Sequence, residues 1–543
     1  MKQKDSFLKG FITCFIITLI IWSLYTYLNT TPIHIRWGSK FNIFLILFIL
    51  LSGAFAYFSE GVTQKKTIYS VLIASGLLVV SNIIFFCITT PLFHSSDYRA
   101  LIGNVEEKKF EKDVSHVDLK ELPTIDKELA RNYADKKLGE IPALGSQMEV
   151  GDLTIQQIKG KLYYVAPLEH TGIFKWFKNS KGTKGFIKVS ATDSQDVELV
   201  TSVKGKDVNL KYLPSSYFNS NLYRHVYLNH PTKGVKGYTF ELDDEGNPYW
   251  VASVYKRTIG RSGEVITGTL VIDPQTGKMK EYSIKDTPKW VDIIQPKSTI
   301  ADYLDYWGEY VHGYINFSNQ DKLETTEGMQ VIYNNGECYF YTGISSVGKD
   351  ESTVGFVLAN TRTGKTSFYK VSGATETASM QSAEGSVQQL RYTATFPILI
   401  NVQNEPTYFL TLKDKKGLVK SYAMVNVENY NIVAIGDSLQ ATLNNYVKSL
   451  AGKSSHTNLN SNGLERSEVG TIERIGSLTN ENGQVFYILL KEKPNTLLMV
   501  PSSISKELPL SKEGDKVKFS YIELPNMSGI TAKEFENENM DIK

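Results

Sequence analysis

The chain has 543 residues, of which 42% are hydrophobic and 21% charged, and its 59 Lys and Arg residues nearly balance 57 Asp and Glu residues. This length corresponds to several domains, and a net charge of +2 excludes a strongly basic nucleic-acid-binding protein, so no nucleic-acid partner is expected. Aromatic residues make up 12% of the chain, which excludes wholesale disorder.

Three charge-free apolar stretches occupy the first hundred residues, roughly over 11–28, 41–58 and 69–93. Because about 20 apolar residues cross a bilayer, the pattern predicts a three-helix transmembrane anchor over residues 1–93. Ionisable residues are missing from these stretches, which disfavours transport and favours an anchor in contact with membrane lipid. The same helices are candidates for homo-oligomer formation, and Asn82 is expected to bond another helix.

Lys and Arg residues beside the apolar stretches set the predicted orientation. Three lysines precede the first stretch and Lys65 and Lys66 lie in the second short loop, against Arg36 and Lys40 in the first short loop. This small excess favours a cytoplasmic N-terminus. We therefore predict a multi-pass cell-membrane protein with a large extracytoplasmic C-terminal region.

Cysteine and metal-ligand patterns suggest neither disulfides nor a metal site. Cys338 is the only cysteine beyond the apolar stretches, so an intrachain disulfide framework is not expected there. The histidines are scattered, without the spacing of a zinc motif. We expect no metal and no cofactor.

Residues 94–123 are rich in mixed charge and are expected to form a solvated stalk. A helix is predicted over about 126–138, with Thr124 as its N-cap. A loosely repeated pattern of a turn, a strand containing a Tyr and further strands follows, centred on Tyr163, Tyr249, Tyr339 and Tyr408. It predicts four tandem α+β modules with antiparallel sheets, over residues 124–200, 201–297, 298–373 and 374–451.

Two of the modules share a turn of the form Asp/Asn-x-x-Thr-Gly, at Asp273–Gly277 and Asn360–Gly364. An Asx bond at its start and a positive φ at its glycine would suit a tight strand connection. The phrase Val271-Ile-Asp-Pro-Gln-Thr-Gly-Lys-Met279 resembles the strand–turn–strand of PepSY domains, which are small exported α+β modules. The resemblance covers only this short phrase, and the first and fourth modules lack the Thr-Gly turn. It implies a helix packed on an antiparallel sheet and a binding or inhibitory role.

The last hundred residues divide into three parts. Residues 452–468 are expected to be a polar linker, 469–524 a small β barrel of OB or SH3 type, and 525–543 a disordered acidic tail. One strand of the barrel has no clear place in the sequence. A barrel of this kind does not by itself indicate a function.

One segment combines large aromatics with lysines, in what the pattern predicts to be a hairpin tip: Phe174, Lys175, Trp176 and Phe177. Aromatics with a basic rim suit a bilayer interface or a partner groove. In the alternative interpretation, Phe174 and Phe177 are core residues at strand ends and the lysines only aid solubility.

Candidates for catalysis are few, and no catalytic residue is predicted. Glu169, His170 and Asp193 are the residue types of an acid–base pair, although a surface histidine in a loop is the simpler interpretation. The sequence therefore favours a non-enzymatic, membrane-anchored scaffold or binding protein of the bacterial envelope that holds a protein or envelope-polymer partner. The alternatives are a PepSY-like regulator of an exported peptidase and an envelope hydrolase.

Overall fold

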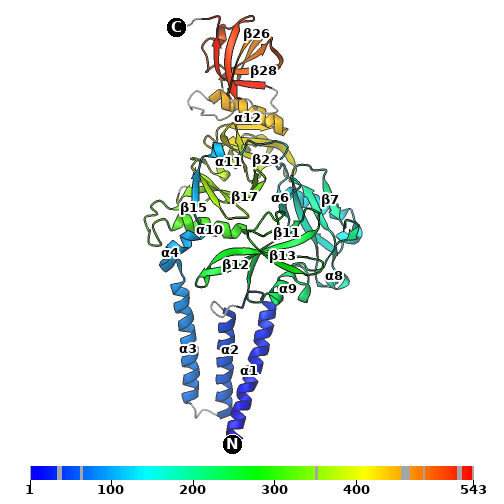
Figure 1. The fold of residues 1–543 in the computed structure, drawn as a ribbon, viewed down its shortest axis with the longest axis vertical. Helices are drawn as coiled ribbons and strands as arrows, with labels where there is room; N and C mark the ends of the chain where they lie inside the picture. Colours follow the sequence, from blue (N-terminus) through cyan, green and yellow to red (C-terminus); the bar gives the residue numbers. More distant parts are fainter. Residues whose placement is uncertain are drawn as a thin grey trace. The chain divides into compact units, whose positions relative to one another are not determined.

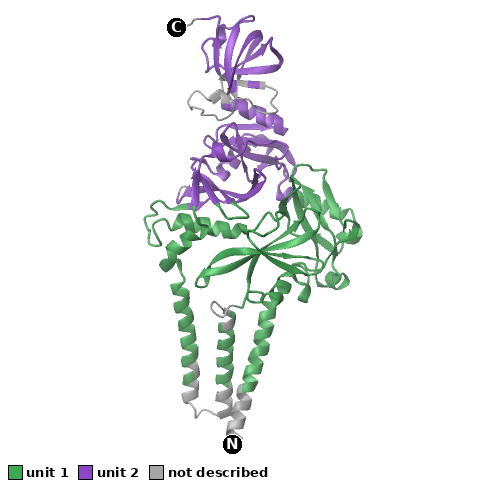
Figure 2. Cartoon of the chain, viewed as in Figure 1, with its two compact units in different colours: residues 1–104, 130–323, 360–365 green, residues 105–129, 324–359, 366–543 purple. Residues whose placement is uncertain are grey.

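The computed structural model describes residues 2–33, 39–60, 65–348, 352–453, 465–480, 483–522 and 529–540. The chain divides into two compact units (Figure 2). Unit 1 comprises residues 1–104, 130–323 and 360–365, and unit 2 comprises residues 105–129, 324–359 and 366–543. The two units are described separately below.

Unit 1 begins with three long helices, α1 (Lys2–Leu28), α2 (Ser39–Glu60) and α3 (Lys65–Ile88) (Figure 1). The prediction of three transmembrane helices is wrong. Within the described residues, no single helix is both long enough and apolar enough to cross a membrane. Within the described residues, the apolar stretches of the first two helices, Ile12–Leu28 and Asn42–Ala54, fall below the length that the criterion requires. The third predicted span is broken near Pro91, and its two halves pass the criterion only as a pair bent by 42°.

Polar contacts join the three helices to one another. Trp22 Nε1 donates to the carbonyl of Lys40 at 2.9 Å, which ties α1 to the first turn of α2. Asn42 Nδ2 donates to Asn82 Oδ1 at 2.6 Å, so the expected bond from Asn82 to another helix is confirmed. Arg261, at the tip of a β hairpin of unit 1, donates to the same Asn82 oxygen at 2.6 Å.

The expected solvated stalk, residues 94–123, is folded instead. It contains α4 (Pro91–Arg99), η1 (Ala100–Ile102), β1 (Val105–Lys108) and α5 (Phe110–Asp113). Apolar residues between its charges explain the difference, since Phe110 and Val114 are buried in the core of unit 2. Strand β1 pairs in parallel with β19 (Thr366–Tyr369).

The rest of unit 1 holds two α+β modules. The helix predicted over 126–138 is α6 (Lys127–Gly139), but its cap is Asp126 rather than Thr124, because Asp126 Oδ1 accepts the Leu129 N–H at 2.9 Å. The first module has an antiparallel sheet in the order β2–β4–β6–β7, with β3 also paired to β4. Its elements are α7 (Pro142–Gly145), β2 (Met148–Val150), β3 (Thr154–Ile158), β4 (Lys161–His170), α8 (Ile173–Lys178), β5 (Thr183–Lys184), β6 (Phe186–Ser190), β7 (Val197–Val200), β8 (Ser202–Val203), β9 (Lys206–Asp207) and β10 (Asn209–Leu210).

The second module repeats this plan with an antiparallel sheet in the order β11–β12–β13–β14. Its elements are η2 (Phe218–Ser220), α9 (Leu222–Asn229), β11 (Gly234–Leu242), β12 (Pro248–Ile259), β13 (Ser262–Ile272), β14 (Met279–Ser283) and α10 (Lys297–Glu309). Apolar residues from both modules share one core, including Val165, Phe186, Phe240 and Trp250. The two sheets therefore fold as a pair, because each buries its apolar face partly against the other.

Unit 2 contains a second pair of modules that also share one core, with Phe356 and Tyr369 from the third and Tyr408 and Leu410 from the fourth. The third module is built from β15 (Leu323–Thr325), β16 (Gln330–Asn334), β17 (Glu337–Ser346), β18 (Ser352–Asn360), β19 and β20 (Gly373–Ala374). The fourth is built from α11 (Glu376–Gly385), η3 (Gln388–Leu390), β21 (Thr393–Ala394), β22 (Ile398–Val402), β23 (Glu405–Lys413), β24 (Val419–Asn426), β25 (Val433–Gly436) and α12 (Leu439–Lys453).

The two Asp/Asn-x-x-Thr-Gly turns have the predicted geometry. Gly277 and Gly364 both have φ of +74°. Asp273 Oδ1 accepts the Gln275 N–H at 2.8 Å, and Asn360 Oδ1 accepts the Arg362 N–H at 3.1 Å. The same local chemistry thus makes the same strand connection in both pairs of modules.

A closed barrel ends unit 2, as the glycine-punctuated strands predicted. Its strands are β26 (Glu465–Asn480), β27 (Gly483–Leu490), β28 (Lys493–Pro501), β29 (Lys516–Ile522) and β30 (Gly529–Asn537), with η4 (Leu508–Leu510) before β29. The missing strand is β30, so the expected disordered tail is wrong for these residues. Ala532 and Phe535 of β30 are buried in the barrel core, although charged residues stand next to them in the sequence. The linker expected over 452–468 lies largely outside the described residues, and β26 already begins at Glu465.

Candidate functional site

The aromatic segment predicted as a hairpin tip forms a short helix, α8 (Ile173–Lys178). Gly172, with φ of +131°, ends β4 and allows the chain to turn into the helix. Trp176 is buried, whereas the side chains of Phe174 and Phe177 are 83% and 56% exposed. The alternative that both phenylalanines are core residues therefore does not hold, and Trp176 is the residue that fixes the segment to the fold.

Trp176 packs against rings from another part of unit 1. Its ring centroid lies 5.8 Å from that of Tyr217 and 5.7 Å from that of Phe218. Phe218 is 53% exposed and lies 6.5 Å from the Phe177 ring, so Phe177 and Phe218 form an exposed pair beside Trp176, and the exposed Phe174 precedes Trp176 by two residues on α8. We call these four residues the aromatic cluster.

Sequence reasoning missed Phe218, because it is distant from α8 along the chain and has no repeating pattern around it. Its φ of +50° is unusual for a large side chain. The conformation is held from α9, where Arg224 Nη1 donates to the Phe218 carbonyl at 2.9 Å. A costly backbone geometry that keeps an apolar ring in solvent is more typical of a contact surface than of a core.

The aromatic cluster is joined directly to the end of α1. Tyr27 Oη donates to Asn219 Oδ1 at 3.0 Å, and Arg224 Nε donates to the Tyr27 carbonyl at 3.0 Å. The Arg224 guanidinium also lies 4.5 Å from the centroid of the Tyr27 ring. The last turn of α1 is therefore bonded directly to η2, which carries the exposed Phe218 ring.

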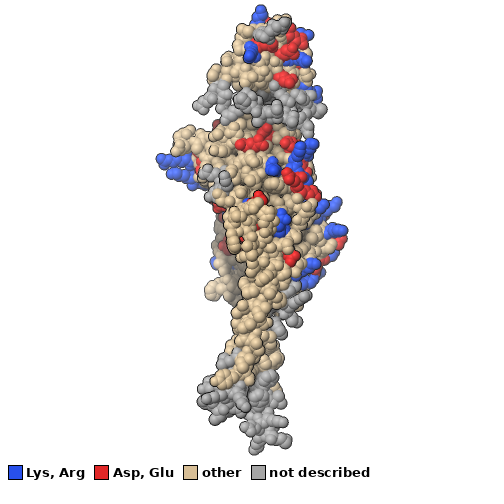
Figure 3. All heavy atoms as spheres, turned by 90° about the vertical axis from the view of Figure 1, so that its left-hand side faces the viewer, with Lys and Arg blue, Asp and Glu red and all other residues tan. Residues whose placement is uncertain are grey.

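Helix α1 carries an exposed aliphatic stripe at four-residue spacing, composed of Ile12, Ile16, Ile20, Leu24 and Leu28. Residues four apart lie on the same face of a helix, so the stripe is continuous. Helix α3 exposes a comparable set: Ile73, Leu77, Val80, Ile84 and Ile88. No charged side chain appears on the described helical surface that faces the viewer in Figure 3. We call these two surfaces the aliphatic stripes.

Lysines flank the α8 part of the aromatic cluster along the chain. Lys175 Nζ donates to the Ser146 carbonyl at 3.0 Å. Lys178, Lys181 and Lys184 are exposed. The segment that carries the exposed phenylalanines is therefore also rich in exposed cations.

The candidate catalytic residues are not brought together. His170 is buried, both of its ring nitrogens have no hydrogen-bond partner, and burial lowers its pKa to about 4. The neighbouring Glu169 accepts the Ser215 N–H at 3.1 Å, and Asp193 accepts the Gln195 N–H within a turn. An imidazole without a carboxylate partner lacks the arrangement that acid–base chemistry needs. Among the residues that the structure describes, no group of three or more His, Cys, Asp or Glu side chains is placed to hold a metal ion.

Comparison with known protein families finds no matching family model, and comparison with curated protein sequences finds no match. The resemblance of Val271–Met279 to PepSY modules therefore stays a prediction.

Proposed function

We propose that this chain is a non-catalytic binding protein that attaches to membrane lipid through its aliphatic stripes and its aromatic cluster. The observation that carries the proposal is the exposed stripe from Ile12 to Leu28, joined through Tyr27 to the exposed Phe218 ring. Proteins in water rarely expose contiguous apolar surface of this extent unless it meets a lipid or protein partner.

The chemistry of the aromatic cluster favours lipid as that partner. Aromatic rings prefer the boundary between hydrocarbon and headgroups, and lysines beside them attract anionic lipids. The rings of Phe174 and Phe177, with Lys178 and Lys181 beside them, have this composition. The position of the modules outside the cytoplasm stays a prediction, as does the holding of a protein or envelope polymer by the modules and the barrel.

Two other functions, an envelope hydrolase and a regulator of an exported peptidase, have less support from the structure. An envelope hydrolase has little support, because Glu169, His170 and Asp193 make separate contacts. A PepSY-like regulator of an exported peptidase is compatible with the paired α+β modules but has no feature that favours it over a scaffold. Addition of the protein to a peptidase assay would test that alternative.

Spin-label accessibility in liposomes tests the proposal. Cys14, Cys87 and Cys338 would be replaced by alanine in the full chain, and a nitroxide would be attached at Ile20→Cys or at Phe174→Cys. Leu510→Cys, an exposed apolar residue of the barrel, serves as the control. In vesicles of phosphatidylcholine and phosphatidylglycerol, we expect labels at 20 and 174 to relax more with oxygen than with a water-soluble nickel complex. The control label should do the reverse. Water-like accessibility at positions 20 and 174 would overturn the proposal.

A further inference from the structure

A cavity of about 210 Å³ opens in unit 1 where the chain leaves α1. One wall is the segment that follows α1, and the others come from α9, β11 and β12. The residues that matter for its chemistry are Thr30, Thr31, Tyr223, Lys233, Tyr238 and Tyr255. The cavity thus adjoins both α1 and the helix whose Arg224 holds Phe218.

Hydrogen-bond donors dominate the walls. Of the described residues that line the cavity, none is an Asp or Glu, whereas four tyrosines, two threonines, His230 and Lys233 contribute hydroxyl, imidazole or ammonium groups. Burial raises the pKa of both Tyr223 and Tyr238, so these hydroxyls remain protonated and able to donate across the physiological range. A cavity with this lining suits an anion with several acceptor oxygens.

Cations behind the walls add to the positive potential. The ammonium of Lys40 is buried and lies 4.2 Å from the centroid of Tyr227, a ring that lines the cavity. It donates to the main-chain carbonyl of Asn29 rather than to a carboxylate, so its charge is not neutralised by that contact. Lys236 also lies near, 5.5 Å from the Tyr255 ring, but its ammonium is paired with Glu264 at 2.8 Å and adds little.

Four nearby acids act in the opposite direction. Glu281 pairs with Lys233, Glu264 acts on Tyr255, and Glu169 and Asp152 act through space on Tyr223. None of these acids lines the cavity. The ion pair of Lys233 is partly exposed, so water already screens it and an anion can compete for the ammonium.

We infer that this cavity binds the phosphate group of a membrane lipid. The inference rests on the proposed function, since the aliphatic stripe of α1 would hold the acyl chains beside the cavity mouth. Thr30 and Thr31 lie two and three residues after Leu28, the last residue of that helix, which places hydroxyl groups at the level where a headgroup would lie. The Thr31 hydroxyl donates to Asn29 Oδ1 at 2.8 Å, so Thr30 is the donor of the two that is available to a ligand. A free phosphate shares the same chemistry, and the test separates the two sources.

Lipid retention by the full chain in detergent, measured by native mass spectrometry, provides the test. The probes are dioleoylphosphatidylglycerol and dioleoylglycerol, which lacks the phosphate, and inorganic phosphate is titrated separately by calorimetry. The variants are Lys233→Met and Tyr238→Phe. Their matched controls are Lys280→Met and Tyr282→Phe on β14 of the same sheet, where Lys280 lies 4.7 Å from the Tyr282 ring. Glu281→Gln removes the acid partner of Lys233 while leaving the cavity intact.

We expect the phospholipid to be retained about tenfold better than the diacylglycerol, and Lys233→Met and Tyr238→Phe each to weaken it by about fivefold to tenfold. The two controls should retain it as well as the unaltered chain does, and Glu281→Gln, which frees the Lys233 ammonium, should retain it at least as well. Equal retention of both lipids, or no effect of either cavity variant, would overturn the inference. Calorimetric binding of inorganic phosphate as tight as that of the lipid would overturn the lipid as its source. Loss of all lipid retention with phosphate binding intact would instead count against the proposed function.

Discussion

Glu241 lies on β11 with no exposed surface, next to a second acid. Thr239 Oγ1 donates to its Oε1 at 2.6 Å, and the Asp292 N–H donates to its Oε2 at 3.0 Å. Burial, and then the charge of Asp292, raise the pKa of Glu241 to about 8, against a smaller opposing effect of Arg362. The folded chain therefore keeps this carboxyl protonated at neutral pH.

This shift makes the stability of unit 1 depend on pH. In the unfolded chain Glu241 ionises near its ordinary pKa of about 4.5, so its contribution is fully present below that pH. The free energy of unfolding should fall as the pH rises from about 4.5 to about 8, by several kcal/mol. Glu241→Gln should remove this slope and unfold at higher denaturant at pH 8.5 than the unaltered chain. Denaturant unfolding at pH 5 and pH 8.5 measures the effect, with the exposed Glu245→Gln as the control. An unchanged slope in Glu241→Gln would contradict the assignment.

At the scale of single elements, two turn glycines of the same sheet can be compared. Gly277 lies between β13 and β14, and Gly246 lies between β11 and β12. A Cβ at Gly277 would lie 2.6 Å from His225 Nε2 and 2.6 Å from Tyr212 Cε2, with φ of +74°. A Cβ at Gly246, with φ of +84°, would meet no atom within 4 Å. Gly246→Ala should therefore cost about 1–2 kcal/mol from backbone strain alone.

Gly277→Ala should cost about 2 kcal/mol more than Gly246→Ala, because the clash with packed side chains adds to the strain. Thermal unfolding of both variants gives the comparison. Equal losses would show that the strands shift to admit the new methyl group, and that the contact of the turn with α9 is loose.

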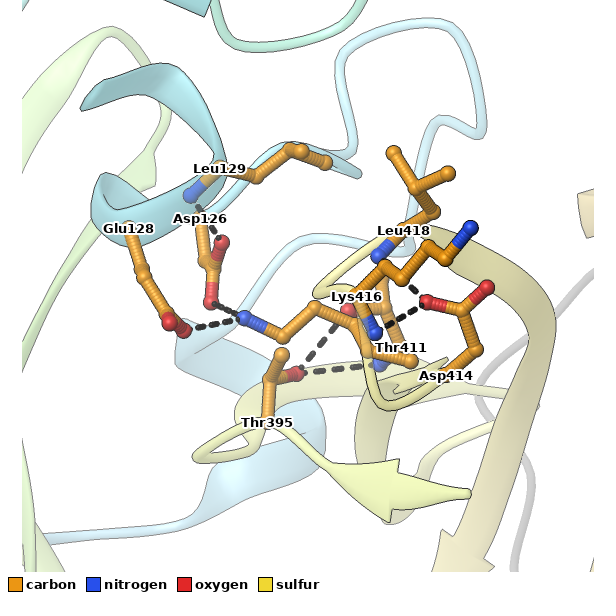
Figure 4. Close-up of polar contacts among 9 residues, drawn as sticks. Asp126, Glu128, Leu129, Thr395, Thr411, Asp414, Lys416 and Leu418 are labelled. Carbon is orange, nitrogen blue, oxygen red and sulfur yellow. Dashed lines mark hydrogen bonds and ion pairs between the residues drawn. The ribbon is translucent and has the colours of Figure 1, made fainter. Parts of the chain in front are cut away.

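Lys413, the last residue of β23, bonds to two acids at the start of α6, Asp126 and Glu128, which are labelled in Figure 4. Lys413 Nζ donates to Asp126 Oδ2 at 2.8 Å and to Glu128 Oε2 at 2.6 Å, and its side chain is only 8% exposed. Burial alone would lower the pKa of Lys413, but the bonds to the two acids reverse the shift and raise it. The ammonium therefore keeps its charge in the fold and holds both acids.

Lys413→Met should destabilise unit 2 by about 1–3 kcal/mol, because the two acids lose their partner but can still reach water. Lys416→Met, at an exposed position in the turn that follows β23, is the control. Hydrogen exchange at the Leu129 amide, which Asp126 also accepts, should accelerate in Lys413→Met alone. A loss of stability in both variants would point to the turn rather than to the ion pair.

At the scale of the whole molecule, features set by local chemistry were predictable from the sequence and features set by distant contacts were not. The turns at Gly277 and Gly364 and four strands of the barrel follow from nearby glycines and Asx side chains. Strand β30 was missed because its buried Ala532 and Phe535 are interspersed with the exposed acids Glu534 and Glu536. Phe218 was missed because only the fold brings it to Trp176. Hydropathy alone also predicted one continuous span over residues 69–93, because it does not detect the break in the helix near Pro91.

Separate hydrophobic cores predict that the barrel and the first module pair unfold independently. The barrel core contains Phe519 and Phe535, and the core of the module pair contains Phe240 and Trp250. No residue belongs to both of these cores. A cavity in one should therefore leave the stability of the other unchanged.

Phe519→Ala should destabilise the barrel by about 3–5 kcal/mol, because Phe519 is almost fully buried. In hydrogen exchange resolved by peptide, β27 and β29 should lose protection while β12 and β13 keep theirs. Phe240→Ala, equally buried, should produce the reverse pattern. If either substitution accelerated exchange in both regions to the same extent, the two cores would unfold as one cooperative unit.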